Sequence, residues 1–190
     1  LLLSIGFVAY RNSTEFIANS AQVLHSREVR GNLHRILSLV EEIETGQRGY
    51  IITGEDSFME PYRQASNKIE ERLTHVRTLV VNEPELHPQL DTLASLVRSR
   101  VAFAAESIEL RRSKGFAAAR DLIVSGKGQE EMDQIRTVIA EMRNTERIQL
   151  LEHSRKTSAL AQSTMTVAQA GSGLAVFIAL VIGTAYRWGL

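Results

Sequence analysis

The sequence predicts an all-α fold: an up-down-up-down four-helix bundle whose long first and last helices continue into two transmembrane helices. In four segments, apolar residues recur at alternating intervals of three and four, the pattern of helices that share one core. The chain of 190 residues contains three prolines, so few positions interrupt a helix. The connections between these segments are short, which makes consecutive helices antiparallel neighbours.

The first bundle helix is predicted from Arg11 to Thr53. Its first part is polar, and its second part follows the bundle spacing with Gln47 as the one polar member. The positions in this pattern are Leu33, Ile36, Val40, Ile43, Gln47 and Tyr50. Gly54 is expected to end the helix as a left-handed cap.

The second helix is predicted from Ser57 to Val81. Ser57 and Glu60 have the spacing of a capping box, and Pro61 falls in the first turn, where proline is tolerated. The expected core positions are Met59, Tyr62, Ser66, Ile69, Leu73, Val76 and Val80.

The third helix is expected to begin at Pro84 or Pro88, since proline suits the first turn of a helix. Its pattern contains one extra step of four, through Leu86, Leu90, Leu93, Val97, Val101, Ala104 and Ile108. A short helix at residues 116–124 follows. The last helix begins near Gln129, with Met132, Ile135, Ile139 and Met142 toward the core.

Both ends of the chain are apolar. Residues 157–186 include no charged residue, and a membrane helix needs about 20 residues. We place this helix at residues 165–187, with residues 188–190 at the start of the cytoplasmic side. Residues 1–10 are too short to span a bilayer, and we interpret them as the truncated end of a first membrane helix. The domain between the two membrane helices is then residues 11–164.

Helix lengths predict how the bundle stands relative to the lipid bilayer. The first and last helices should be roughly 60 and 55 Å long, and the two between them roughly 35–40 Å. The shorter helices cannot reach the membrane, so the bundle should stand away from it. Gly54 and residues 115–128 would lie at the far end, and residues 82–88 at the underside.

Two glycines interrupt the predicted first helix. Gly46 and Gly49 each cost about 1 kcal/mol relative to alanine inside a helix. We interpret them as sites of close packing against a neighbouring helix, with a hinge as the alternative. The structural positions of this stretch are Gly46, Gln47, Gly49, Thr53, Gly54 and Pro61.

The candidate ligand-binding residues are Glu44, Arg48, Tyr50 and Tyr62. Glu44 and Arg48 have the spacing of a surface ion pair worth about 0.2–0.5 kcal/mol. The alternative is that Arg48 holds an anionic ligand or pairs across the bundle with Glu130 or Asp133.

Several functions are disfavoured. The 22 basic and 22 acidic residues leave no net charge, so nucleic acid is not an expected partner. Without cysteine there is no thiolate metal site, and the five histidines share no metal-binding spacing. We expect surface histidines, no metal and no cofactor. The sequence shows no nucleophile–base pair and no phosphate loop, so we do not expect an enzyme in this chain.

A stripe of small residues follows the predicted second membrane helix. Gly171, Ala175, Ala179 and Gly183 recur every four residues, and such stripes let membrane helices approach closely. We expect this face to pack against the first membrane helix or against the same helix of a second subunit.

The stretch from Glu44 to Tyr62, ETGQRGYIITGEDSFMEPY, resembles the hallmark of the third class of CHASE domains. Residues 82–84 (NEP), 110–115 (LRRSKG), 126–128 (GKG) and 132–136 (MDQIR) also fit, so the resemblance covers nearly all of residues 30–155. It implies an extracytoplasmic helical sensor between two membrane helices of a bacterial receptor. The family pattern names no catalytic residues.

The resemblance implies a function in signal transduction. The chain is expected to be the sensory region of a homodimeric receptor in the bacterial inner membrane, with residues 11–164 in the periplasm and an unknown small molecule or protein as stimulus. The parent protein would be a two-component sensor histidine kinase, whose output domain would follow Leu190. The alternatives are a diguanylate cyclase or chemotaxis-type receptor, or a structural dimerisation and spacer bundle.

Overall fold

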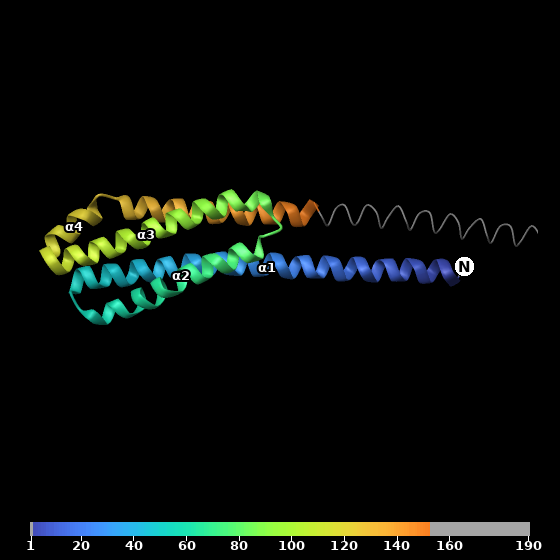
Figure 1. Cartoon of the computed structure of the whole chain (residues 1–190), viewed down its shortest axis with the longest axis horizontal. Helices are drawn as coiled ribbons and strands as arrows, with labels where there is room; N and C mark the ends of the chain where they lie inside the picture. The colour runs from blue at the N-terminus through green and yellow to red at the C-terminus, as the bar shows by residue number, and fades with distance from the viewer. Residues whose placement is uncertain (1, 153–190) are drawn as a thin grey trace, which may run out of the picture. The chain divides into compact units, whose positions relative to one another are not determined.

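The computed structural model describes residues 2–152, and over that range it consists of helices and turns without a strand (Figure 1). The all-helical prediction is confirmed for these residues. The predicted second membrane helix at 165–187, with its stripe of Gly171, Ala175, Ala179 and Gly183, lies outside them, as do residues 188–190. Among the described residues, no helix has an apolar stretch long enough to cross a bilayer.

Helix α1 runs without interruption over Leu2–Thr53, so the bundle helix predicted from Arg11 continues into the apolar segment before it. It ends as predicted at Gly54, whose φ of 76° lies in the left-handed region. The Gly54 N–H donates to the carbonyl of Tyr50 at 2.7 Å, which satisfies one of the last carbonyls of the helix.

The predicted capping box at the start of the second helix is wrong. A 3₁₀ turn, η1 (Asp56–Phe58), occupies this stretch, and α2 covers Met59–Leu79. Because Ser57 is inside the turn, it cannot cap the helix, and Phe58 takes the cap position without a side-chain hydrogen bond. Pro61 falls in the first turn of α2, as expected.

The third helix is preceded by a second 3₁₀ turn, η2 (Pro84–Leu86), and α3 covers His87–Lys114. The short helix α4 covers Phe116–Val124, as predicted. The last helix is described over residues 127–152.

The chain divides into two compact units, and the bundle lies in the unit His25–Arg147. The other unit is Leu1–Leu24 with Ile148–Leu190. Within the bundle, α1, α2, α3 and the last helix contribute to one hydrophobic core. The predicted core positions of α1 and the last helix are buried.

In α2 and α3 the buried face differs from the prediction by one residue at two places. Ala65 is buried and Ser66 is half-buried, while Arg100 is buried and Val101 is half-buried. A core helix of a bundle contacts neighbours on two sides, so its buried face is wider than a single line of residues.

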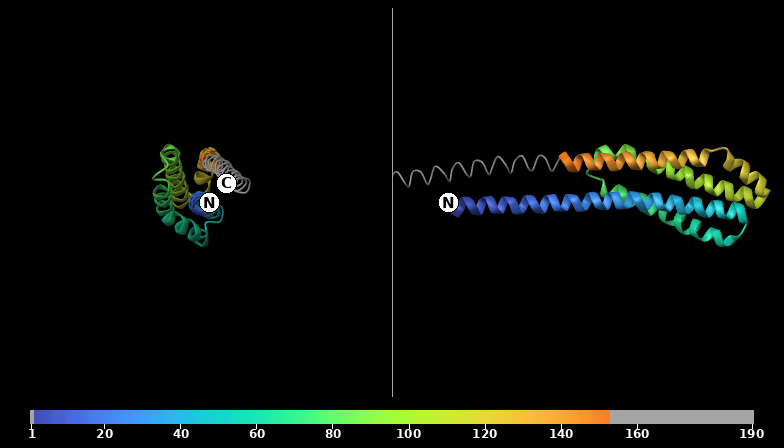
Figure 2. Two further views of the ribbon diagram at one scale, coloured as in Figure 1. Left: turned by 90° about the vertical axis from the view of Figure 1, so that its right-hand side faces the viewer. Right: turned by 180° about the vertical axis from the view of Figure 1, so that it is seen from behind.

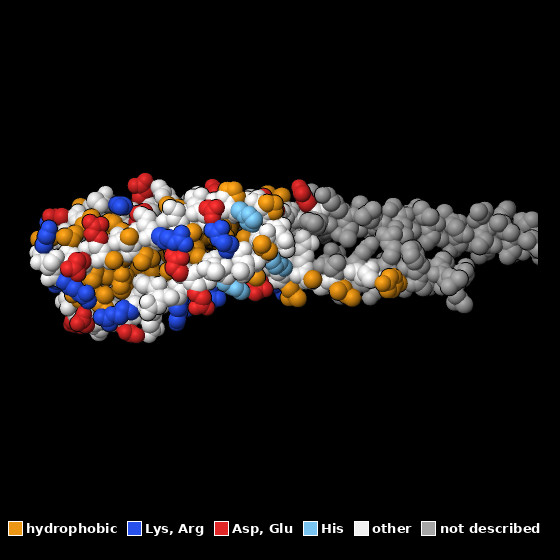
Figure 3. All heavy atoms as spheres, viewed as in Figure 1, with side chains coloured by type: hydrophobic (Ala, Val, Ile, Leu, Met, Phe, Trp, Pro, Cys, Tyr) orange, Lys and Arg blue, Asp and Glu red, His pale blue; other side chains and the backbone are white. Residues whose placement is uncertain are grey.

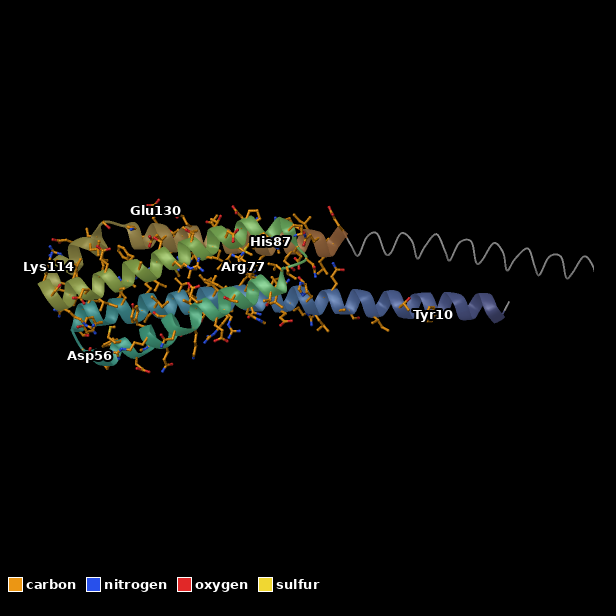
Figure 4. The ribbon with its side chains drawn as sticks, viewed as in Figure 1. Tyr10, Asp56, Arg77, His87, Lys114 and Glu130 are labelled. Atoms are coloured by element: carbon orange, nitrogen blue, oxygen red, sulfur yellow. The ribbon has the colours of Figure 1, made fainter. Side chains whose placement is uncertain are left out.

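The turns of the bundle alternate between its two ends. The α1–α2 turn and the α3–α4 turn lie at one end, and the α2–α3 turn lies at the other (Figure 2). Asp56 and Lys114 accordingly lie at one end of the bundle, whereas His87 lies toward the other (Figure 4). We call the first of these ends, formed by the α1–α2 turn, the α3–α4 turn and α4, the tip.

Candidate functional site

The two glycines of α1 permit close packing at the tip. A Cβ on Gly46 would lie 2.8 Å from the carbonyl oxygen of Phe58 and 2.9 Å from Cβ of Tyr62. A Cβ on Gly49 would overlap Cδ1 of the Phe58 ring. Real side chains do not approach this closely, so the start of α2 can reach α1 because these two positions lack a side chain.

Two arginines of α3 hold the end of α1. Arg111 donates from Nε to the carbonyl of Ile51 at 2.8 Å. Arg112 donates from Nε to the hydroxyl of Tyr50 at 3.3 Å, with its guanidinium carbon 5.5 Å from the centre of that ring. The hydrogen bond that Arg112 donates to the Tyr50 hydroxyl is the main cause that raises the pKa of Arg112. The segment LRRSKG therefore contacts the end of the segment ETGQRGY directly.

A second set of contacts, a buried polar network, also joins α1 to α3. Gln47 is 1% exposed. Its amide nitrogen donates to the hydroxyl of Ser107 at 2.6 Å, and its amide oxygen accepts from Nη2 of Arg100 at 2.9 Å. Both hydrogen-bonding groups of the Gln47 side chain are thus engaged across the interface.

Arg100 is the largest buried polar side chain of this network and is 2% exposed. Its Nε and Nη1 atoms have no hydrogen-bond partner among the described residues. The carboxylate of Glu44 lies 4.0 Å from Nη2, and the guanidinium carbon lies 5.6 Å from the centre of the Phe103 ring. Burial lowers the pKa of Arg100, while the carboxylates of Glu44 and Glu131 oppose that shift.

A cavity of about 120 Å³ lies beside Arg100. Residues from α1, α3, α4, the turn at Gly126 and the start of the last helix line it. The lining residues that matter for its chemistry are Glu44, Gln47, Arg48, Arg100, Phe103 and Gly128. A Cβ on Gly128 would lie 2.7 Å from the Phe103 ring. The backbone at Gly128 can therefore pack closely against this ring because the position has no side chain.

The structure brings Glu44 and Arg48 of the predicted ligand-binding set to this cavity. They form an ion pair at 2.8 Å, and the Arg48 side chain is 58% exposed. The expected ion pair of Glu44 and Arg48 is thus present, whereas the alternative partners of Arg48 across the bundle, Glu130 and Asp133, have other contacts. Glu130 accepts a hydrogen bond from Gln134 instead, and Asp133 pairs with Arg136 at 3.2 Å.

The two tyrosines of the predicted set have a different environment. Tyr50 belongs to a small apolar cluster with Met59 and Ile108, and Tyr62 packs against that cluster. Tyr50 is 7% exposed. These side chains contribute to the packing of the tip next to the cavity.

Sequence reasoning missed Arg100, although a signal was present. The interval pattern Leu90, Leu93, Val97 leads by its next step of three to Arg100, and then to Ala104 and Ser107. The prediction avoided a charged core position by inserting an extra step of four to Val101. Two polar residues on a core face, one turn before and one turn after Ala104, indicate a partner such as Gln47 on a facing helix.

At the opposite end of the bundle, His25, Glu83 and Glu146 meet. His25 Nε2 lies 2.6 Å from Oε1 of Glu83, and burial raises the pKa of Glu146 while Ser26 opposes that shift through a hydrogen bond. Possible ligand atoms of the three residues lie within 4.8 Å of one another. The His25 side chain is 37% exposed, in line with the expected surface histidine, and it also joins α1 to the α2–α3 turn.

These three side chains are the group of described residues that could hold a metal ion. The hydrogen bond between His25 and Glu83 holds two of them together without an ion, while Oε2 of Glu83 has no hydrogen-bond partner among the described residues. The expectation of no metal site stays a prediction.

The surface of the tip carries charged side chains of both signs around hydrophobic ones on the face in view (Figure 3).

Comparison with known proteins yields two findings. Residues 19–156 match the family model of the CHASE3 domain. The fold is similar to the crystal structure of the sensor domain of the histidine kinase HK9 from Rhodopseudomonas palustris, with a TM-score of 0.62 and 23% identity. That match covers 66% of this chain and 98% of the other. No curated protein matches the sequence.

Proposed function

The chain belongs to the CHASE3 domain family, and from this we propose that it is the sensory and signal-transmitting region of a bacterial membrane receptor, with residues 11–164 outside the cytoplasm. CHASE3 domains are sensor domains, so we assign this chain no catalytic role. The observation that carries the proposal is the extent of the family match, residues 19–156, which includes every helix of the bundle.

The packing of the bundle offers a physical route for a signal. Helix α1 and the last helix both place residues in the common core, for example Ile43 and Ile139. Both helices also extend beyond the bundle unit His25–Arg147. A stimulus that changes how these helices pack would therefore shift or rotate their continuations. Such coupling requires two packing states with different affinities for the stimulus.

A histidine kinase is the output we favour for the full receptor, since the similar solved structure is the sensor domain of a histidine kinase. Diguanylate cyclase and chemotaxis-type receptors are the alternatives. The receptor would lie in the inner membrane, anchored in the lipid bilayer.

The test joins residues 1–190 to the cytoplasmic part of a histidine kinase with a transcriptional reporter. We expect the intact fusion to change its output across a panel of small-molecule stimuli, and a fusion without residues 25–147 to lose that regulation. A deletion that keeps regulated output would instead support a structural spacer.

We further propose that the receptor is a homodimer. Tyr10, Ile17 and Leu24 of α1 are 70%, 64% and 63% exposed, and their intervals of seven place them on one face of the helix. A hydrophobic face of this kind is typical of a contact with a second copy.

Single cysteines test the proposed dimer face. Ile17→Cys and Leu24→Cys should form disulfide-linked dimers on mild oxidation in membranes. Gln22→Cys, on the opposite side of α1, is the matched control and should cross-link much less. Equal cross-linking at all three positions would argue against this face.

A further inference from the structure

We propose that the cavity beside Arg100 binds a small, planar oxyanion with a single negative charge, such as acetate, formate, bicarbonate or nitrate. The inference rests on the proposed sensory function, for which it names the class of stimulus. Its binding test, however, does not depend on signalling.

The buried guanidinium of Arg100 provides the first argument. The side chain is 2% exposed and lines the cavity. Nη2 is engaged by Gln47, while Nε and Nη1 have no hydrogen-bond partner among the described residues. A guanidinium remains charged in a protein, and its N–H groups match the oxygens of a carboxylate or a similar planar anion. These donors make Arg100 the anchor for an oxyanion.

The local charge balance indicates a singly charged ligand. Arg48, Arg100 and Lys127 supply three positive charges, and Glu44 and Glu131 supply two negative ones. Glu44 pairs with Arg48 at 2.8 Å, and Lys127 lies 4.0 Å from Glu131. Glu44 also lies 4.0 Å from Nη2 of Arg100, so two arginines share this one carboxylate and the group keeps one positive charge in excess. One monovalent anion would balance it, whereas a dianion would leave an excess negative charge beside Glu44.

The size of the cavity limits the ligand. Its volume of about 120 Å³ lies below the range of roughly 300–1,000 Å³ for drug-sized ligands. At about 30 Å³ for one water in the liquid, it corresponds to roughly four small non-hydrogen groups. Formate, acetate, bicarbonate and nitrate have this size, whereas nucleotides and sugars are too large.

The walls of the cavity connect the ligand to the bundle. Gln47 and Arg48 belong to α1, Arg100 belongs to α3, Ile123 belongs to α4, and Gln129 belongs to the last helix. A bound anion would stabilise the arrangement in which these elements surround it. Because α1 and the last helix are the two helices that leave the bundle, the cavity is placed where a ligand could change their packing.

Binding is measured on the 190-residue chain by thermal unfolding and isothermal titration calorimetry. Sodium acetate, formate, bicarbonate and nitrate are compared with sodium chloride at equal ionic strength. We expect a saturable rise in Tm of a few degrees with at least one of the four, because a ligand that binds the folded state stabilises it. A larger effect of acetate and formate would assign a carboxylate, and a larger effect of nitrate or bicarbonate would assign an inorganic anion. Succinate should give no saturable rise, and a rise with succinate alone would contradict the size class.

Three variants localise the effect. Arg100→Met removes the anchor at similar side-chain length, and Ile123→Phe reduces the cavity while keeping Arg100. Both should lose the anion-dependent rise in Tm. Arg98→Met is the matched control, since Arg98 is an exposed arginine of α3 that pairs with Glu70, and it should keep the full rise. If Arg100→Met fails to fold, Ile123→Phe still decides the matter.

The outcomes separate this inference from the sensory function. No rise with any of the four anions, or a rise that persists in a folded Arg100→Met or Ile123→Phe variant, would overturn the anion site and leave the reporter experiment unaffected. Binding that Arg100→Met abolishes, together with an output of the fused kinase that follows the anion, would support the inference. Binding without any change in output would keep the anion site but contradict its role as the stimulus site.

Discussion

At the scale of single residues, Gln47 and Arg100 determine how α1 and α3 meet. Buried polar groups stabilise a fold only when they are paired, because each unpaired group loses its hydration without compensation. The Gln47 side chain donates a hydrogen bond to Ser107 and accepts one from Arg100. The network therefore selects one register between the two helices, and a shift by one residue would leave several polar groups unpaired.

Replacing Gln47 by Leu should lower the free energy of unfolding by about 2 kcal/mol or more, since it leaves Nη2 of Arg100 and the hydroxyl of Ser107 without this partner. Urea unfolding followed by circular dichroism measures the change. Gln64→Leu is the control, because Gln64 is exposed and contacts Glu60 within α2. It should change stability by less than about 0.5 kcal/mol. Equal losses in the two variants would show that the network contributes little.

Glu146 makes the stability of the bundle depend on pH. Its pKa is raised above the ordinary value of 4.5, mainly by burial and further by Glu83, while Ser26 and His25 oppose the shift. Its ionisation is thus less favourable in the folded state than in the unfolded one. The stability that Glu146 contributes is present below pH 4.5 and is lost as pH rises through the raised pKa.

Glu146→Gln should remove this dependence. Relative to the unchanged chain, the variant should become more stable as pH rises from about 4 toward 7. Thermal unfolding in a series of buffers measures the difference. Glu85→Gln, in the exposed part of the α2–α3 turn, is the control. A Glu146→Gln profile parallel to that of the control would exclude the proposed contribution of this carboxyl.

At the scale of helices, the glycines of α1 show how one residue type has opposite effects at different positions. A Cβ on Gly31 would meet no neighbouring atom within 4 Å, whereas Gly46 faces the backbone of Phe58 and Gly49 faces its ring. Helix propensity alone favours alanine at all three positions. Packing decides the effect at the two positions of the tip.

Gly31→Ala should therefore stabilise the chain by about 1 kcal/mol. Gly46→Ala should destabilise it by about 1–3 kcal/mol, because the added methyl group would overlap backbone that cannot rotate away. Gly49→Ala should have a smaller cost if the Phe58 ring can move. Chemical denaturation of the three variants measures these signs. A stabilising Gly46→Ala would instead favour the hinge as the role of this glycine.

At the scale of the whole molecule, the core of the bundle is self-contained. All of its buried members lie between Val29 and Met142, within the unit His25–Arg147. A compact unit of this size with its own core can fold alone.

A fragment of residues 25–147 should therefore be soluble, helical and cooperatively folded. Circular dichroism and thermal unfolding measure this, with the Gln47→Leu fragment as a destabilised reference. A fragment that is helical but melts without a cooperative transition would show that the remainder of the chain is needed for the fold.

The helices of this chain could be predicted because their signals are local. Interval patterns, prolines and Gly54 located α1, α2, α3, α4 and the last helix within a few residues. Short turns then predicted their antiparallel order. The start of α2 was predicted incorrectly because a capping box and a 3₁₀ turn share the same residue types, and the packing of Phe58 over Gly49 decided between them.

The partners across the bundle depended on the tertiary structure. The sequence by itself determined which face of each helix is apolar, that Gln47 lies on such a face, and that the chain resembles one family of sensor domains. It did not determine that Gln47 meets Arg100, that Arg111 reaches Ile51, or that His25 meets Glu83. These pairs are separated by 53, 60 and 58 residues. The physical reason is that spacing along a helix defines a face, whereas the rotation and crossing of two packed helices define which side chains on those faces touch.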